Sequence, residues 1–287
     1  MKALAAAKIN LYLDVKGRRP DGYHEIETFY QPVSLWDELV FESIPAGIEV
    51  TGDDPSIPWN EENLCHRAAR LAFERTGFRG GLKIAVHKGI PSGAGLGGGS
   101  SDAAATLVAV NVLFDLGLAR ADLLDLGAEL GSDVPFFVLG KPSIGRGRGE
   151  ILEEASGLPE AWILIVMSNV TISTKWAYEN LTLLLTRADG KAKLERLKEG
   201  LTRFPDICLE TYNSFEMGVI ERFPSVAGVL RILREAKPIL SSLSGSGSAC
   251  FAVFEGENEA REISERFKGE GFFSRVVKPI GHAIRFA

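Results

Sequence analysis

Cysteine and long apolar runs are scarce in this chain. The three cysteines are an odd number without a C-x-x-C pair, which argues against a disulfide framework and a cysteine zinc site. The longest uninterrupted apolar run covers residues 161–167, far short of the roughly 20 residues of a transmembrane helix. Lys8 interrupts the apolar start of the chain, which argues against a secretory signal. We therefore expect a soluble, cytoplasmic protein without a membrane partner.

Basic clusters and metal-ligand patterns are missing too. Thirty-two basic residues stand against 38 acidic ones, the formal charge is −6, and no basic run of five or more occurs. This argues against a nucleic-acid partner. His66 and His87 have no second ligand at metal spacing, which favours packing or surface roles over a protein-held metal. An anionic ligand would be met by backbone N–H groups and by local cations such as Lys8, Lys88, Arg146 and Arg148.

Glycine is concentrated in one stretch, GIPSGAGLGGGSSD at residues 89–102. The stretch lies between an alternating run at 82–88, typical of a strand, and an apolar run at 103–116, typical of a helix. Glycine lets a ligand approach the main chain closely. A helix N-terminus attracts anions, and the Ser-Ser-Asp of residues 100–102 offers good cap residues. Strand, glycine loop and helix start together predict a phosphate site.

Several kinds of phosphate loop do not match this stretch. No G-x-x-x-x-G-K-[ST] occurs, which excludes a Walker-type loop, and the protein-kinase motifs H-R-D and D-F-G are absent. Gly93, Gly95 and Gly98 satisfy G-x-G-x-x-G, a weak match shared with dinucleotide-binding proteins. Those proteins need an acidic residue at the end of a second strand about 20 residues later, whereas Asp115 lies in a helical run. A flexible linker is disfavoured because periodic segments flank the stretch.

The periodicity predicts an α+β protein of two domains, residues 1–157 and 158–287. In the first domain we expect strands at 8–15, 28–33, 37–42 and 82–88, helices at 61–76, 103–116 and 120–130, and an apolar strand or short helix within 131–140. In the second we expect strands at 162–167, on both sides of a Gly/Ser turn within 242–254, at 274–278 and at 283–286, and helices at 174–185, 192–201, 224–236 and 257–268.

Two charged residues are candidates for chemistry at a phosphate site. Phosphoryl transfer needs a held triphosphate, an acceptor hydroxyl in line and usually a carboxylate that receives the proton. Asp133, among apolar residues, could be this base, but an Asp after Gly-Ser is also a common turn or cap residue. Lys8 lies on the polar face of the strand at 8–15 and could be catalytic or an ordinary solvated lysine. The residue pattern alone leaves both alternatives open.

Four segments carry a resemblance to a known family. They are AKINLYLDV with GRRPDGYHEI within 7–26, IPSGAGLGGGSSDAA at 90–104, GSDVPFF at 131–137, and SGSGSACF at 244–251. Their order and spacing, over almost the whole chain, resemble the GHMP small-molecule kinases. Ala6-Ala7 and Ser132 depart from the Pro-Ala and Gly-Ala-Asp of many members, but the functional residue types are intact.

The resemblance implies a fold and an activity. The fold would combine an N-terminal domain like part of ribosomal protein S5 with a ferredoxin-like C-terminal domain, with the site in the cleft between them. The activity would be phosphorylation, by ATP with Mg²⁺, of the 2-hydroxyl of a cytidine diphosphate conjugate of methylerythritol in the non-mevalonate isoprenoid pathway. We expect a monomer or weak homodimer.

The resemblance also implies roles for individual residues. Asp133 would be the general base, and Lys8 would stabilise the carboxylate and the developing alkoxide. The nucleotide would contact Asn63, Lys88, Pro91, Ser92, Gly93, Ala94, Gly95, Leu96, Gly97, Gly98, Gly99, Ser100 and Ser101. The alcohol substrate would contact Asn10, Tyr23, His24, Thr174 and Tyr178, with the ring of Tyr178 stacked on cytosine.

Other functions remain open from the sequence. A homoserine, mevalonate or galactose kinase would share the glycine loop but would give no reason for Tyr23, His24 and Tyr178. A dinucleotide-binding oxidoreductase rests only on G-x-G-x-x-G, and a regulator would bind ATP without turning it over. Arg146 and Arg148 could contact a phosphate or lie in a solvated turn.

Overall fold

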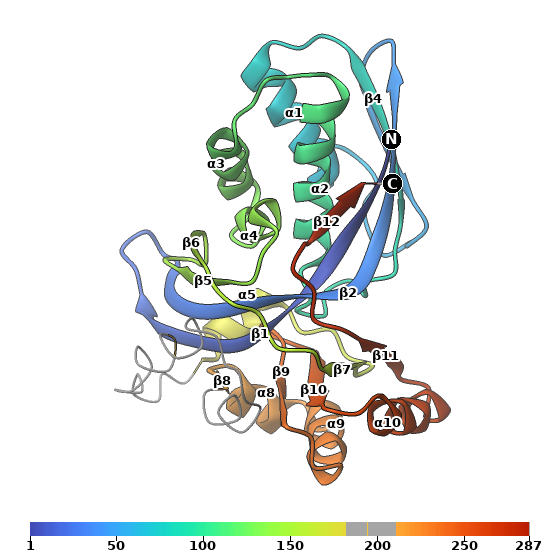
Figure 1. Ribbon diagram of the computed structural model, residues 1–287. Coiled ribbons are helices and arrows are strands. Elements are labelled where there is room, and N and C mark those ends of the chain that lie inside the picture. Colours follow the sequence, from blue (N-terminus) through green and yellow to red (C-terminus); the bar gives the residue numbers. More distant parts are fainter. Residues whose placement is uncertain (182–193, 195–210, 287) are drawn as a thin grey trace.

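The chain folds into two β-sheets with helices packed on them, as the α+β prediction requires (Figure 1). The computed structural model describes residues 1–181, 194 and 211–286. Within these residues the larger sheet has eight strands, with the central order β12-β1-β2-β4-β3, and the smaller has four, in the order β11-β7-β10-β9. No helix in the described residues is long and apolar enough to cross a bilayer.

Two long antiparallel strands, β1 (Lys2–Arg18) and β2 (His24–Ile44), form the centre of the molecule. The prediction of two separate strands at 28–33 and 37–42 was wrong. Register shifts, such as the one between Ala6 and Ala7, disturb the alternation without ending the pairing. The polar face of β1 is not solvated, because Lys8 and Asn10 are each 3% exposed.

Helices cover one face of the larger sheet. α1 (Leu64–Thr76) and α3 (Arg120–Leu130) confirm the predicted helices, and they pack with α2 (Gly98–Leu113) and α4 (Val134–Leu139). Of the strand or short helix expected within 131–140, the structure has the helix, because proline is tolerated in the first turn, where the missing N–H of Pro135 is not needed. Further strands of this sheet are β3 (Ile48–Gly52), for which no strand was predicted, β4 (Gly81–His87), β5 (Ser143–Arg146) and β6 (Ile151–Glu154).

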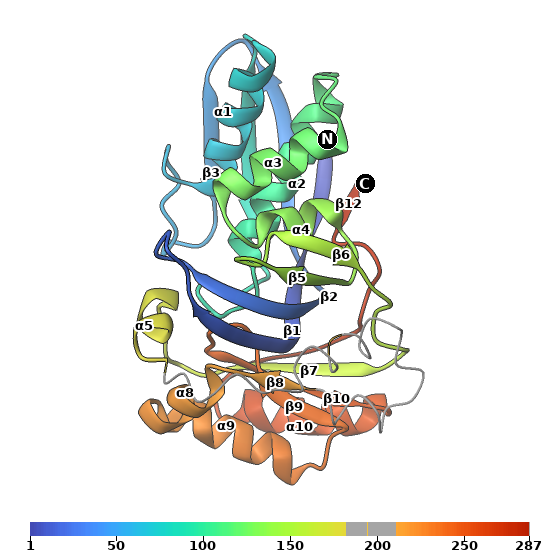
Figure 2. The same cartoon turned by 90° about the vertical axis from the view of Figure 1, so that its left-hand side faces the viewer.

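The smaller sheet lies between α9 and α10 on one side and the bent part of β1 and β2 on the other (Figure 2). Its strands are β7 (Trp162–Met167), β9 (Leu240–Leu243), β10 (Ala249–Phe254) and β11 (Phe273–Val277). α9 (Pro224–Glu235) and α10 (Glu257–Gly269) confirm the predicted helices. α5 (Thr174–Glu179) ends earlier than predicted, the helix expected at 192–201 lies outside the described residues, and α8 (Glu216–Arg222) and β8 (Tyr212–Asn213) were not predicted.

The two sheets share a buried core. Ile9 of β1 packs in one cluster with Ile165 of β7 and Phe251 of β10. The last strand, β12 (Ile284–Phe286), returns to pair with β1. We propose the domain boundary at residues 157 and 158, because β1 to β6 all belong to the larger sheet and the smaller sheet begins with β7, although β8 and β12 later return to the larger sheet.

This shared core gives a stability prediction. Phe251 is fully buried, so Phe251→Ala should lower the free energy of unfolding by about 3 to 5 kcal/mol through lost contacts and a residual cavity. Met217 is 66% exposed, so Met217→Ala should change it by less than about 0.5 kcal/mol. Urea unfolding of both variants measures these changes, and similar losses would contradict a core centred on Phe251.

Candidate active site

The glycine loop connects β4 to α2, but the helix begins at Gly98 rather than near residue 103. Its N-cap is Gly97, whose φ of 75° is left-handed and whose carbonyl accepts the Ser101 N–H at 2.9 Å. The expected capping by residues 100–102 was therefore wrong. A glycine can turn the chain into the helix at a backbone angle that would strain other residues, so the serines and Asp102 fall within the first turns.

Both sheets hold the loop in place. The Lys8 N–H of β1 donates to the Leu96 carbonyl at 2.9 Å. From the smaller sheet, the Ser244 hydroxyl donates to the Gly95 carbonyl at 3.0 Å. A Cβ on Gly95 would lie 2.2 Å from the Ser244 carbonyl oxygen, so the two backbones approach too closely for any side chain there. The turn at 244–248 thus acts as a support for the glycine loop.

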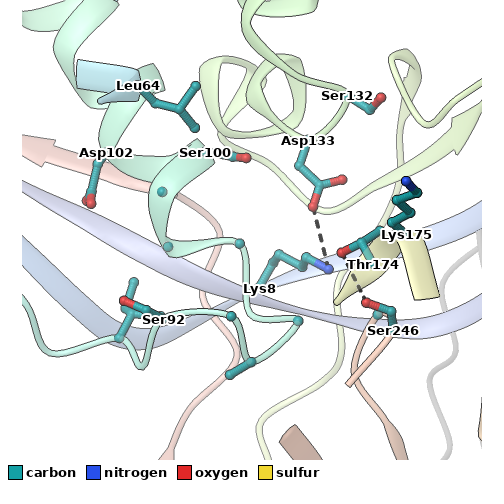
Figure 3. A pocket seen from close by; sticks show the side chains of 18 of the residues that line it. Lys8, Leu64, Ser92, Ser100, Asp102, Ser132, Asp133, Thr174, Lys175 and Ser246 are labelled. Atoms are coloured by element: carbon teal, nitrogen blue, oxygen red, sulfur yellow. Dashed lines mark hydrogen bonds and ion pairs between the residues drawn. The ribbon is translucent and has the colours of Figure 1, made fainter. Parts of the chain in front are cut away.

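A cavity of about 1160 Å³ opens beside the loop (Figure 3). Residues of the loop, β1, the β1–β2 connection, α4's N-cap and α5 all line it. The structure brings every predicted site residue to this cavity except Leu96 and Ser101, which are buried behind it at 1% and 0% exposure. Residues 166 positions apart in sequence, Lys8 and Thr174, therefore border the same space.

Lys8 and Asp133 face each other across this cavity, with Lys8 Nζ 3.7 Å from Asp133 Oδ2 (Figure 3). The Lys8 side chain is 4% exposed, which contradicts the solvated-lysine alternative, and its Nζ also donates to Asn10 Oδ1 at 2.6 Å. Burial lowers the pKa of Lys8, and the Asp133 carboxylate opposes this shift. The ammonium can thus interact strongly with a nearby anion, because water screens it little.

Tyr30 is a partner of Asp133 that the sequence did not reveal. Its hydroxyl donates to Asp133 Oδ1 at 3.0 Å. Burial, together with the Asp133 carboxylate, raises the pKa of Tyr30 well above its usual value, so the hydroxyl stays protonated and remains a donor. Tyr30 was hidden in a segment that reads as an ordinary core strand, 103 positions from its partner.

An aromatic pair lies at another part of the cavity. The rings of His24 and Tyr178 are stacked with their centroids 4.7 Å apart, and Phe215 meets Tyr178 edge-on at 4.9 Å. Burial and then the nearby Arg18 charge lower the pKa of His24, which keeps its ring neutral near pH 7. Burial raises the pKa of Tyr178 to about 12. The pair thus offers flat, uncharged surfaces.

Lys88 lines the cavity, but two acidic side chains already contact its ammonium. Asp37 contacts Lys88 Nζ directly, and Asp102 Oδ2 lies 2.7 Å from it. Asp37 Oδ1 also accepts the N–H groups of Gly89 and Ile90 at 2.7 and 2.8 Å, which fixes the start of the loop. Burial and the neighbouring Asp37 raise the pKa of Asp102 to about 8 despite the Lys88 ammonium. Sequence reasoning missed Asp37, because the three charges come from separate elements.

Known proteins resemble this chain over nearly its whole length. Residues 63–141 match the family model for the GHMP kinases N terminal domain, and residues 191–272 match that for GHMP kinases C terminal. A protein of Citrifermentans bemidjiense named 4-diphosphocytidyl-2-C-methyl-D-erythritol kinase is 39% identical over 98% of this chain and 99% of its own. A protein of Pelotomaculum thermopropionicum with the same name is 39% identical over 93% of each chain.

Solved structures agree with these relatives. A crystal structure of 4-(cytidine 5'-diphospho)-2C-methyl-D-erythritol kinase is 35% identical and superimposes with a TM-score of 0.79, covering 98% of this chain and 100% of that one. Homoserine kinase from Cytophaga hutchinsonii also has a TM-score of 0.79, over 99% of this chain and 96% of that one, at 20% identity. At that identity the second likeness shows a shared fold only.

The Lys88 network predicts a pH dependence of stability. The pKa of Asp102 in the folded protein, about 8, is above the value of about 3.9 for an unfolded chain. The folded form therefore holds a proton that the unfolded form releases, and this contribution to stability is lost as pH rises through that interval. Asp102→Asn cannot titrate. The stability of the wild type relative to this variant should thus fall by about 1 kcal/mol per pH unit between pH 5 and 7.

Urea unfolding of both proteins at pH 5, 6 and 7 measures this difference. All other titrating groups are common to the two proteins, so their contributions cancel to first order. A stability difference that stays constant with pH would show that Asp102 is ionised in the folded protein throughout this range.

Proposed function

Since the chain belongs to the GHMP kinases and, within them, to the 4-diphosphocytidyl-2-C-methyl-D-erythritol kinases, we propose that it phosphorylates the 2-hydroxyl of that cytidine conjugate. It is an ATP-dependent small-molecule kinase, and the products of the proposed reaction are the 2-phosphate and ADP. The observation that carries the proposal is one cavity that joins a glycine loop at a helix start, the Lys8–Asp133 pair and the stacked His24–Tyr178 pair.

ATP would place its phosphates against the loop at the start of α2. α2 has 16 residues, so its N-terminus carries unpaired N–H groups and a partial positive charge that favour an anion. Lys88 contributes little free charge, because Asp37 and Asp102 bind it. The attraction for phosphate would therefore come mainly from the backbone.

The need for ATP as a substrate and two buried free cysteines favour a cytoplasmic location.

A magnesium ion would enter bound to ATP. The described residues contain no group of three or more His, Cys, Asp or Glu side chains that could hold a metal. Mg²⁺ with nucleotides usually takes few protein ligands and keeps phosphate oxygens and waters. The Ser100 hydroxyl, which lines the cavity at the start of α2, fits such a role as a hard oxygen donor. The ion would neutralise charge on the phosphate oxygens.

Asp133 would accept the proton of the acceptor hydroxyl as its oxygen bonds to the γ-phosphorus and ADP leaves. Tyr30 holds one carboxylate oxygen, which leaves Oδ2 on the side of Lys8. Lys8 is held in turn by Asn10, whose amide donates to Thr28 Oγ1 at 2.8 Å. The ammonium is thus fixed where negative charge develops, which is the arrangement that stabilises a transition state without reorganisation.

The cytosine ring would stack on Tyr178 beside His24. Stacking on an aromatic side chain accepts any base, so discrimination must come from hydrogen bonds to the base edge. The neutral His24 ring, with one N–H donor and one acceptor nitrogen, suits that task. Thr174, whose hydroxyl pairs with that of Ser246 at 3.3 Å, joins α5 to the turn that supports the glycine loop.

The proposed chemistry predicts loss of turnover without loss of binding. Asp133→Asn keeps the shape but cannot accept the proton, so kcat should fall by about 10² to 10⁴ with both KM values little changed. Lys8→Met should also lower kcat. Glu129→Gln, a carboxylate-to-amide change outside the cavity, is the control and should keep wild-type kinetics. Coupled ADP-release kinetics measure these values. An unchanged kcat in Asp133→Asn would contradict the general-base role and show that the carboxylate is structural.

The proposed specificity predicts a selective change in KM. Tyr178→Ala should raise KM for the cytidine conjugate about 5- to 150-fold, while KM for ATP stays nearly constant. Tyr178→Phe keeps the ring and its contact with Phe215, so it should behave like the wild type. The uridine analogue should be a much poorer substrate.

Steady-state kinetics across these substrates test the assignment. Equal kcat/KM for cytidine and uridine conjugates would contradict the proposed substrate, and so would efficient phosphorylation of homoserine or mevalonate. Either result would leave the assignment as an ATP-dependent kinase intact.

A further inference from the structure

The turn between β5 and β6 places an arginine between two parts of the cavity. Arg148 lines the cavity, and its guanidinium carbon lies 4.7 Å from the centre of the Tyr23 ring, next to His24 in sequence. The following residue, Gly149, packs on Tyr30: a Cβ there would lie 2.3 Å from the hydroxyl oxygen that donates to Asp133. The turn thus borders both the Tyr23–His24 segment and the tyrosine that binds Asp133.

The two arginines of this turn differ in their surroundings. Arg146 pairs through Nη1 with Glu153 at 3.1 Å and does not line the cavity. Arg148 is bound to Glu150 through its backbone N–H at 2.6 Å and through Nε at 3.5 Å. In the part of the chain that the structure describes, no acid contacts the Arg148 Nη atoms. Four of the five guanidinium N–H donors therefore remain for a ligand.

The other cationic side chains that line the cavity differ from Arg148 in their partners and their exposure. Lys8 and Lys88 are bound by carboxylates, and Lys175 is 84% exposed on α5. Arg18, the cross-strand partner of His24, also lines the cavity at the aromatic part. Two arginines, Arg18 and Arg148, therefore border the aromatic part of the cavity, and the Glu150 contact of the Arg148 guanidinium involves only its Nε.

We propose that Arg148 binds the diphosphate of the cytidine substrate, an inference that rests on the proposed function. The diphosphate joins the nucleoside to the alcohol that reacts, so it must span the space between the aromatic pair and Asp133. A guanidinium matches two phosphate oxygens with parallel N–H groups, which an ammonium cannot do. Stacking on Tyr23 holds the guanidinium plane in place.

Equilibrium binding of cytidine and CDP tests the proposal, because the two ligands differ only in the diphosphate. Titration calorimetry of the wild type should give tighter binding for CDP than for cytidine. Arg148→Gln should weaken CDP binding by about 5- to 50-fold, the scale of one partly exposed charge-assisted contact. Its Kd for cytidine and its KM for ATP should stay near the wild-type values. Arg148→Lys keeps the charge without the fork and should be intermediate.

Arg146→Gln is the matched control, since it removes the other arginine of the same turn, and its CDP affinity should be unchanged. An equal loss of cytidine and CDP binding in Arg148→Gln would assign the residue to the base, and a rise in KM for ATP alone would assign it to ATP. Either result overturns the proposal. Should Arg148→Gln fail to fold, as judged by its melting temperature, wild-type CDP affinity in Arg148→Lys overturns it as well. A wild type that binds neither cytidine nor CDP overturns the proposed function itself.

Discussion

The buried ammonium of Lys8 is the constraint on which the active site depends. A charge with 4% exposure is costly unless partners surround it, and here the partners come from separate parts of the fold. The backbone of Lys8 binds the Leu96 carbonyl, and its Nζ faces Asp133. A Cβ on Gly97 would lie 3.2 Å from Lys8 Cγ, and one on Gly245 would lie 3.3 Å from Nζ. Left-handed backbone angles and closer neighbours, the Phe137 ring at Gly97 and the Gly95 carbonyl at Gly245, also favour glycine at these two positions, which border the Lys8 side chain.

A second network of buried charges fixes the position of the glycine loop. Its residues are separate from Lys8 and Asp133, which are proposed for phosphoryl transfer. Asp37 on β2 binds both Lys88 and the backbone at the start of the loop, while Asp102 anchors the same ammonium to α2. This arrangement fixes the distance between strand, loop and helix. It also offsets the charge of Lys88, so in the proposed ATP site the helix N-terminus and backbone N–H groups would attract the phosphates. Buried polar groups that bind one another and the backbone thus decide the shape of the cavity.

Local patterns in the sequence predicted local structure well. The period and stop signals of α1, α3, α9 and α10 lie within each segment, so these helices could be placed. The loop and the motif residues also pointed to one site, because the family resemblance supplies their proximity. Alternation along β1 shows which residues share a face but not what covers it, so burial of Lys8 was missed. Tyr30 and Asp37 were missed because their partners are far away in sequence.

The partial exposure of the Asp133 side chain, the proposed general base, links binding of the acceptor to the phosphoryl transfer step. Asp133 keeps 31% of its side chain exposed, while its neighbours Lys8 and Tyr30 are buried. A hydrated carboxylate is a weak base, and removing water from it raises its affinity for a proton. An alcohol held over Asp133 would displace that water, and under the proposed binding mode the aromatic pair and Arg148 would supply the binding energy that keeps the alcohol there. A small alcohol without the cytidine diphosphate could not hold this position for long. Water would therefore be excluded from the proposed site when the full acceptor is bound, which disfavours transfer of phosphate to water.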